Sequence, residues 1–215
     1  MKITLLCSDL QHPVNAYLKS WALAQAGTHK VEIIQSKDQI KGGDMLFLIS
    51  CSEIIAASER WQYKFCLVLH ASDLPKGRGW SPYIWEIARG AEFITLCLLE
   101  VESKIDSGRI WKKISIIVPK DALWNEINHL LFTAEVEMID YAVQHFAKVQ
   151  PQTQVNTDQA TYFPKRTPTD SKIDVNKSIA EQFNLIRVCD PKRFPAHFDH
   201  LGKRYILKLE KLNEQ

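Results

Sequence analysis

The chain has 215 residues, of which 46% are hydrophobic and 24% are charged, and its formal net charge is +2. These values are typical of a soluble globular protein, and the length suffices for one α/β domain with a small appendage. So small a net charge gives no argument for nucleic-acid binding. No apolar run approaches a membrane span, and the run after Met1 is too short for a signal peptide. We therefore expect a cytoplasmic protein with neither a membrane nor a nucleic-acid partner.

The cysteine and histidine spacing argues against disulfides and metals. The five cysteines are odd in number, show no CxxC spacing, and four of them lie in or next to apolar, strand-like runs. Buried free thiols in a reducing compartment are therefore expected. His197 and His200 are three residues apart, but Pro195 argues against a helix there and no third ligand is evident. The sequence thus predicts no metal site.

The first part of the chain alternates apolar runs with a helical pattern. Apolar spacing of three and four between Pro13 and Ala26 predicts an amphipathic helix that stops at Gly27. The loop between the first run and this helix has neither a GxGxxG pattern nor a P-loop, which argues against hydride and phosphoryl transfer. Alternating strands and helices predict a parallel sheet with crossovers. The expected strands are residues 2–7, 31–34, 45–49 and 65–69.

The second part of the chain begins with two further extended segments, residues 93–101 and 109–118. Asp121 is the expected cap of the helix that follows. An apolar stripe from Trp124 to His145 on that helix is typical of core packing and not of a cofactor site.

The end of the chain changes character after a predicted linker at residues 149–158, which is rich in Gln, Thr and Asn. A short helix at residues 178–187, a loop to His200 and a strand at residues 205–209 then indicate a small appended module. We therefore predict an α/β fold with two parts. A Rossmann-like domain with a mostly parallel sheet occupies residues 1–150, and a small C-terminal α+β module occupies residues 151–215.

The most informative stretch is a buried strand that ends in His70 and opens into a loop with Pro75, Gly77 and Gly79. These residues keep the loop irregular and let its backbone approach a ligand. A helix start follows at Trp80. Open α/β sheets bind ligands outside the carboxyl ends of their strands, which is where this loop is expected.

His70 is the leading candidate for chemistry, and Asp106, which follows a second buried run, is its natural partner. A carboxylate beside an imidazole orients the ring and favours its protonated form. The alternative is that Asp106 and Gly108 only form a turn, and spacing alone does not decide. Ser72 shares the loop, but without a GxSxG elbow a serine hydrolase has little support. Cys51 has no neighbouring histidine to activate it.

The stretch from His70 to Pro82 resembles the formyltransferases that use N10-formyltetrahydrofolate, whose loop reads HxSxLPxxRG. Three other family motifs, D-[ST]-G, RxPxD and IR…YPGA, resemble residues 106–108, 166–170 and 186–196. The resemblance covers most of the chain in the right order. One position departs from it, because Val68 stands where the family carries an oxyanion-stabilising Asn. Losing such a donor typically lowers the rate ~10²–10³-fold.

The resemblance implies that a primary amine attacks the formyl carbon of the folate. His70, held by Asp106, would bind the oxyanion or take the amine proton, with Ser72 as a further catalytic candidate in the absence of the Asn. The folate would lie at two strand ends, near Ile49, Ser50, Cys51, Glu102, Ser103 and Lys104. The acceptor would contact the basic loop and the tail, through Lys76, Gly77, Arg78, Gly79, Trp80, Arg166, Arg187 and Phe194. For Lys76 and Arg78, the alternative is solvated loop charge.

The loop is most similar to that of sugar formyltransferases, close to those of pseudaminic acid pathways. The expected acceptor is a UDP- or dTDP-linked 4-amino-4,6-dideoxyhexose for surface polysaccharide or glycan biosynthesis. One alternative is a different amine, such as a carrier-bound aminoacyl group. Another, suggested by Val68, is an inactive folate- or nucleotide-binding module. The aromatic tail serves either the sugar pocket or a subunit contact, so a homodimer is a further expectation.

Overall fold

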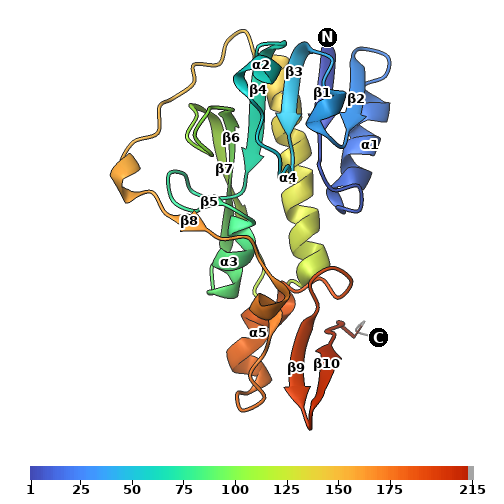
Figure 1. Cartoon of the computed structure of the whole chain (residues 1–215), viewed down its shortest axis with the longest axis vertical. Coiled ribbons are helices and arrows are strands. Elements are labelled where there is room, and N and C mark those ends of the chain that lie inside the picture. Colours follow the sequence, from blue (N-terminus) through green and yellow to red (C-terminus); the bar gives the residue numbers. More distant parts are fainter. Residues whose placement is uncertain (213–215) are drawn as a thin grey trace.

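A six-stranded sheet organises the larger part of the computed structural model, which describes residues 1–212 (Figure 1). Its spatial order is β2–β1–β3–β4–β6–β7. The first four strands in the chain pair in parallel, which confirms the predicted mostly parallel α/β sheet. The strands are β1 (Lys2–Leu6), β2 (Lys30–Ile34), β3 (Gly43–Leu48), β4 (Tyr63–His70), β6 (Phe93–Glu100) and β7 (Ile110–Ile117).

The last two strands, β6 and β7, are antiparallel to their neighbours, which the strand–helix alternation did not predict. The connection from β4 to β6 contains only one regular helix, α3 (Pro82–Ala88), of seven residues. After this helix the chain runs back alongside β4, with His70 paired to Cys97 and Leu67 paired to Glu100.

Two helices cover one face of the sheet, α1 (Val14–Ala24) and the long α4 (Trp124–His145) (Figure 1). The main core lies between them and the sheet. It contains the apolar stripe of α4, which confirms that the stripe serves packing. The start of α4 differs from the prediction, because its cap is Leu123 and not Asp121. The carboxylate of Glu126 accepts a hydrogen bond from the Leu123 amide at 2.8 Å, so the cap is supplied from inside the helix.

The opposite face of the sheet carries a smaller apolar cluster that includes Leu46, Leu48 and Tyr63, with Val68 packed against it. Successive side chains of a strand point to opposite faces, so Val68 and His70 share this face while Leu67 and Leu69 face α4. The helix α2 (Ala57–Arg60) follows β3 along the chain. His70 thus projects from the less covered face, at the carboxyl end of a central strand.

Residues 151–171 run along the larger domain before the chain enters the C-terminal module. Gln152 forms a β-bridge with Ile110. The short strand β8 (Tyr162–Phe163) pairs in parallel with β5 (Arg78–Gly79) in the loop after β4. The predicted boundary at residue 150 stays a prediction. The 3₁₀ turns of the chain are Lys37–Gln39, Thr157–Gln159 and Pro168–Ser171.

The C-terminal module lies at the end of the molecule remote from the N-terminus (Figure 1). It consists of α5 (Ile179–Arg187) and an antiparallel hairpin of β9 (Ala196–His200) and β10 (Lys203–Leu207). It has its own apolar cluster, formed by Ile173, Ile186, Cys189 and Ala196. Strand β9 occupies part of the predicted loop, because the turn at Leu201–Gly202 folds β10 back onto it. Among residues 1–212 no helix combines the length and apolarity that crossing a membrane requires.

Candidate functional site

The side chain of His70 is buried, with 7% of its surface exposed, and has an acceptor near each ring nitrogen. Its Nε2 donates to the carbonyl oxygen of Gly77 at 2.8 Å. Its Nδ1 lies 3.5 Å from Oδ1 of Asp106, which is itself only 10% exposed. The ring is therefore held between the loop after β4 and the loop after β6.

Asp106 has a partner for each carboxylate oxygen. While Oδ1 faces His70, Oδ2 accepts a hydrogen bond from the amide of Gly79 at 2.8 Å. Its backbone is left-handed, with φ of +51°. The turn that contains Asp106 and Gly108 thus also brings the carboxylate to His70. Asp106 is therefore both a turn residue and a neighbour of the histidine.

The loop after β4 folds back on itself. Ser72 is fully buried, and its hydroxyl donates to the carbonyl of Lys76 at 2.9 Å. Gly77 has φ of +72°, and a Cβ there would lie 2.8 Å from Cβ of Ser72. Gly79 has φ of +94°, and a Cβ there would lie 2.6 Å from the carbonyl oxygen of Phe163. Both glycines are therefore required by backbone geometry and close approach. The Ser72 hydroxyl is used inside the loop.

The side chains of the arginines expected at the acceptor are buried in the protein. Arg78 is 1% exposed and donates to Oε1 of Gln154 at 2.8 Å and to the Tyr162 hydroxyl at 3.2 Å. Arg166 is buried and donates to Oγ of Ser171 at 3.0 Å. Buried guanidinium groups that donate to protein acceptors do not face a solvent-borne diphosphate.

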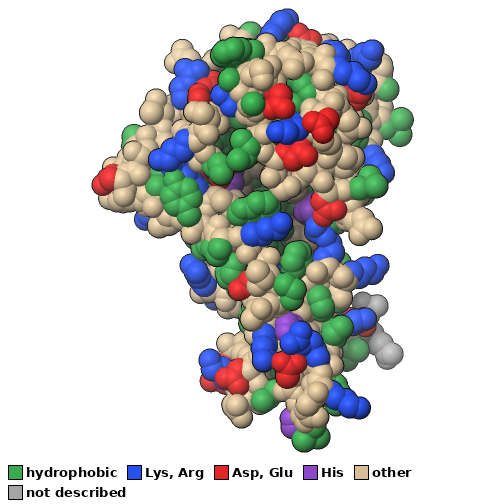
Figure 2. Space-filling model, in the orientation of Figure 1, with side chains coloured by type: hydrophobic (Ala, Val, Ile, Leu, Met, Phe, Trp, Pro, Cys, Tyr) green, Lys and Arg blue, Asp and Glu red, His purple; other side chains and the backbone are tan. Residues whose placement is uncertain are grey.

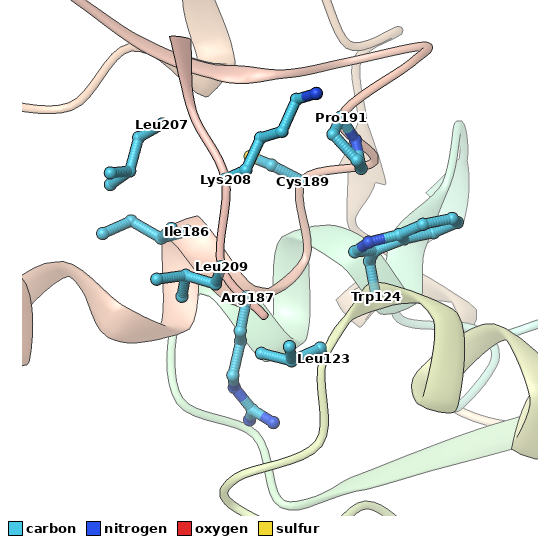
Figure 3. A pocket seen from close by; sticks show the side chains of 9 residues that line it. All are labelled: Leu123, Trp124, Ile186, Arg187, Cys189, Pro191, Leu207, Lys208 and Leu209. Atoms are coloured by element: carbon cyan, nitrogen blue, oxygen red, sulfur yellow. The ribbon is translucent and has the colours of Figure 1, made fainter. Parts of the chain in front are cut away.

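Arg187 also turns inward, at the junction of α5 with the start of α4. Figure 3 shows it pointing past Leu123, away from the other residues around a cavity of about 10 Å³. Its guanidinium donates to the carbonyls of Pro119 at 3.0 Å and Ala122 at 3.2 Å. A cavity of this volume holds one water molecule at most. This arginine joins the C-terminal module to the larger domain.

Lys76 and Trp80 are the residues of the predicted acceptor set that remain exposed in the loop. The ammonium of Lys165 lies 4.9 Å from the centre of the Trp80 ring, a cation–π contact. Phe194 is half-buried and lies beneath two guanidinium groups, those of Arg166 and Arg193. The exposed part of the acceptor set is therefore smaller than the sequence indicated.

The residues expected to bind folate lie at two places along β4. Residues 49–51 follow β3 and lie beside His70, whereas residues 102–104 follow the antiparallel strand β6, whose Glu100 pairs with Leu67, and lie nearer the start of β4. Ile49 is fully buried, Ser50 is exposed in a left-handed conformation, and the loop of residues 102–104 is exposed. Val68, together with half-buried Cys51 and Val101, forms an apolar patch on the face that carries His70. Figure 2 shows the surface hollowed at the lower end of β4, with histidine atoms visible inside the hollow.

The five cysteine side chains are free thiols. Burial raises the pKa of the Cys66 thiol to about 12 and the pKa values of Cys7 and Cys97 to about 11. Burial also raises the pKa of Cys51. Because the thiolate is the reactive form, these four cysteines are weak candidates for a nucleophile.

Sequence reasoning missed Gln154 and Thr161. Gln154 falls in the segment predicted to be a linker, but it is 7% exposed and contacts Arg78 and the Asp106 loop. The hydroxyl of Thr161 accepts from the amide of Gly77 at 2.8 Å. The polar composition of this segment carries no signal of burial, so nothing in the sequence marks these two residues.

Comparison with known proteins identifies the fold. No family model matches the sequence. The chain is 30% identical to the methionyl-tRNA formyltransferase of Lactococcus lactis subsp. cremoris (strain MG1363) over 155 residues, which is 71% of this chain and 47% of that protein. It spans less than half the length of the curated relatives it matches.

Three solved structures share the architecture. The methionyl-tRNA formyltransferase from Clostridium thermocellum superimposes with a TM-score of 0.80 at 22% identity, covering 95% of this chain and 90% of the other. HypX from Aquifex aeolicus in complex with tetrahydrofolic acid gives 0.79 at 19%, covering 96% and 37%. A sugar N-formyltransferase from Shewanella sp FDAARGOS_354 gives 0.75 at 12%, covering 100% and 99%. The fold is therefore that of the formyltransferase enzyme family, to which the sequence similarity also points.

Proposed function

We propose that this protein transfers a formyl group from N10-formyltetrahydrofolate to the primary amine of a nucleotide-linked amino sugar. The observation that carries the proposal is the His70–Asp106 pair, which lies at the carboxyl end of a central strand in a formyltransferase fold. The expected acceptor is a UDP- or dTDP-linked 4-amino-4,6-dideoxyhexose. The product would serve glycan biosynthesis in the cytoplasm.

The chemistry proposed for the pair is proton transfer during amine attack. A neutral amine forms a bond to the formyl carbon, and the carbonyl π electrons move to its oxygen. Once its Nε2 leaves the carbonyl of Gly77, His70 takes the proton that the ammonium must lose, or donates a hydrogen bond to the new oxyanion. Asp106 orients the imidazole and stabilises its charged form. Collapse of the tetrahedral intermediate expels the folate nitrogen, which needs a proton that the same histidine can return.

The apolar patch beside His70 supports the folate half of the proposal. Val68, Cys51 and Val101 give it a half-buried apolar surface against which a flat ring can lie. The exposed residues Ser50 and 102–104 adjoin two members of the patch, Cys51 and Val101, along the chain. Backbone amides and carbonyls there can hydrogen-bond the polar edge of a pterin. The bound tetrahydrofolate of the HypX structure, which shares the fold, is consistent with this assignment.

Two features support a sugar-linked acceptor. The Shewanella sugar N-formyltransferase aligns with this chain over 100% of its residues and over 99% of its own. Exposed Lys76 and Trp80 lie in the loop after β4, near Gly77 and so near His70. A lysine can hold a phosphate as a point charge, and an indole can cover the apolar face of a sugar ring. We assign the diphosphate to Lys76 in place of the buried Arg78.

Val68 favours one second candidate, an inactive module that binds folate but does not transfer the formyl group. Its side chain is packed among apolar neighbours and supplies no hydrogen-bond donor beside His70. A formyltransferase that acts on a different amine, such as a carrier-bound aminoacyl group, is the other alternative.

The test is a transfer assay with N10-formyltetrahydrofolate and a panel of UDP- and dTDP-linked 4-amino sugars. Mass spectrometry would detect the gain of one formyl group, and tetrahydrofolate binding would be titrated in parallel. Transfer to one sugar is the expected result. Folate binding without transfer to any sugar would contradict the acceptor assignment, and a carrier-bound aminoacyl substrate would then separate the two alternatives. Absence of folate binding would overturn the whole proposal.

A further inference from the structure

Arg78 is among the largest fully buried side chains that the structure describes. It is 1% exposed, and among residues 1–212 its charge forms no ion pair within 4.0 Å and its Nε has no hydrogen-bond partner. Its guanidinium donates to two neutral groups, the Gln154 amide and the Tyr162 hydroxyl. Burying a charge without a counter-ion is costly. Such an arrangement persists only where the surrounding structure holds it in place.

Gln154 connects this arginine to the loop that carries Asp106. Its Oε1 accepts from Arg78, and its Nε2 donates to the carbonyl oxygens of Asp106 at 2.8 Å and Gly108 at 3.0 Å. The amide thus uses its acceptor and both of its N–H groups inside the protein. A charge-assisted bond to its oxygen polarises the amide, which strengthens the bonds that its N–H groups donate.

Asp106 needs such support. Its φ of +51° lies in the left-handed region, which costs a non-glycine residue about 1 kcal/mol. The residues before it, 102–105, are exposed. Two amide groups therefore fix it from the other side: Gln154 holds its carbonyl, and Gly79, next to Arg78, donates to its carboxylate.

We propose that Gln154, with its oxygen held by Arg78, is a positioning residue for this reaction. It holds the backbone of Asp106 so that the carboxylate stays between His70 and the Gly79 amide. The inference rests on the proposed function, since it assigns a supporting part to the same pair.

The kinetic test compares Gln154→Glu with Gln152→Glu, an identical change two residues earlier on an exposed side chain. The carboxylate of Gln154→Glu can still accept from Arg78 but cannot donate to the two carbonyls. Groups that orient metal ligands typically contribute 10–100-fold to activity, and we take the same order for a group that orients Asp106. We expect kcat to fall by about that factor, with KM for both substrates changed less than about twofold. Gln152→Glu should match the wild type. A Gln154→Glu kcat within twofold of wild type would overturn the inference.

A second measurement is independent of activity. The amide of Gly79 is bonded to the Asp106 carboxylate, so its hydrogen exchange, followed by NMR, reports whether that carboxylate is in place. In Gln154→Glu we expect exchange at Gly79 to quicken at least about tenfold, as local opening becomes easier, while the core amide of Leu5 stays protected. Unchanged exchange at Gly79, or equal quickening at Leu5, would contradict local positioning. If Gln154→Glu does not fold, the same measurements can be made on Gln154→Met, which keeps the side-chain length but lacks the two N–H donors.

The two measurements separate the two proposals. A wild-type protein that forms no product with any acceptor contradicts the proposed function, and the exchange of Gly79 still decides whether Gln154 holds Asp106. Transfer by the wild type with an unaffected Gln154→Glu variant keeps the function and removes the positioning role.

Discussion

The loop after β4 and the loop after β6 meet at His70, and they are held in different ways. The first loop is largely buried and bonded to itself, through Ser72 and Lys76, and it pairs with β8. The second is exposed along residues 102–105 and is fixed by groups from elsewhere in the chain. The histidine therefore comes from the end of strand β4, beside a loop that β8 and Thr161 also hold, and the carboxylate comes from a loop that depends on Gln154 and Gly79. Side chains that hold the second loop are the weak points of the site.

The largest expected effect on formyl transfer comes from changing His70 or Asp106, which lie where the two loops meet. His70→Asn and Asp106→Asn should each lower formyl transfer about 10³-fold or more, because proton transfer and orientation of the ring are both lost. Circular dichroism should show the wild-type fold in both variants. Asp73→Asn is the matched control, since Asp73 is exposed in the same loop and pairs with Lys113 at the surface. Rates near wild type in both variants would refute the assignment.

Glu135 on α4 is a buried carboxyl group that can be compared with Asp106. It is 4% exposed, its Oε2 has no hydrogen-bond partner among residues 1–212, and burial raises its pKa to about 8. Between its unfolded pKa near 4.5 and about 8, the folded protein keeps a proton that the unfolded chain releases. The free energy of unfolding should therefore fall with rising pH in that window, by up to about 3 kcal/mol between pH 5 and pH 8.

Glu135→Gln should remove this part of the pH dependence. The free energy of unfolding of the variant should therefore increase relative to that of the wild type as the pH rises. Urea titrations at pH 5 and pH 8 would measure it, with Glu137→Gln, exposed on the same helix, as the control. The same pH slope in wild type and Glu135→Gln would be inconsistent with a neutral buried Glu135.

Gly108→Ala is designed to break the second loop. A Cβ at Gly108 would lie 1.9 Å from the carbonyl oxygen of Glu100, so the loop has to move, and Asp106 with it. We expect a loss of about 2 kcal/mol in the free energy of unfolding, as for other overpacked sites, together with weaker formyl transfer. At Gly27 the same substitution meets nothing within 4 Å. Urea unfolding of both variants tests the difference, and equal stabilities would contradict it.

The smallest effect is expected where the first loop faces solvent. Lys76→Ala should change the free energy of unfolding by less than about 0.5 kcal/mol, because the side chain is exposed. If Lys76 contacts the diphosphate, KM for the nucleotide sugar should rise several-fold, with kcat unchanged. Steady-state kinetics would show this against Lys19→Ala, an exposed lysine on α1. An unchanged KM would remove Lys76 from the acceptor site.

Periodicity predicted the fold well, because burial alone dictates apolar runs and helical stripes. The strand that ends in His70 and the stripe of α4 both form as expected. The direction of β6 was beyond prediction, since an apolar run reads the same in either orientation.

The site was predicted only in part, for a reason that Arg78 illustrates. A cation between two glycines reads as a solvent-facing charge, and its burial depends on acceptors that lie 76 and 84 residues further along the chain. Gln154 is hidden for the same reason, because a polar residue in a polar segment is buried only when distant partners satisfy it. The pair of His70 and Asp106 could be predicted from the sequence because each residue comes at or after the end of an apolar run.

The pairing of β5 with β8 also fixes when the site is assembled as the chain is made. All six strands of the main sheet lie before residue 118, whereas the partner of Arg78–Gly79 is Tyr162–Phe163. At about 5–20 residues per second, the ribosome needs several seconds to add the intervening segment. In a nascent chain the sheet and His70 are therefore in place first, and the contacts that hold the carboxylate of Asp106 form later. Premature termination near residue 150 should leave a folded sheet with an unfinished site.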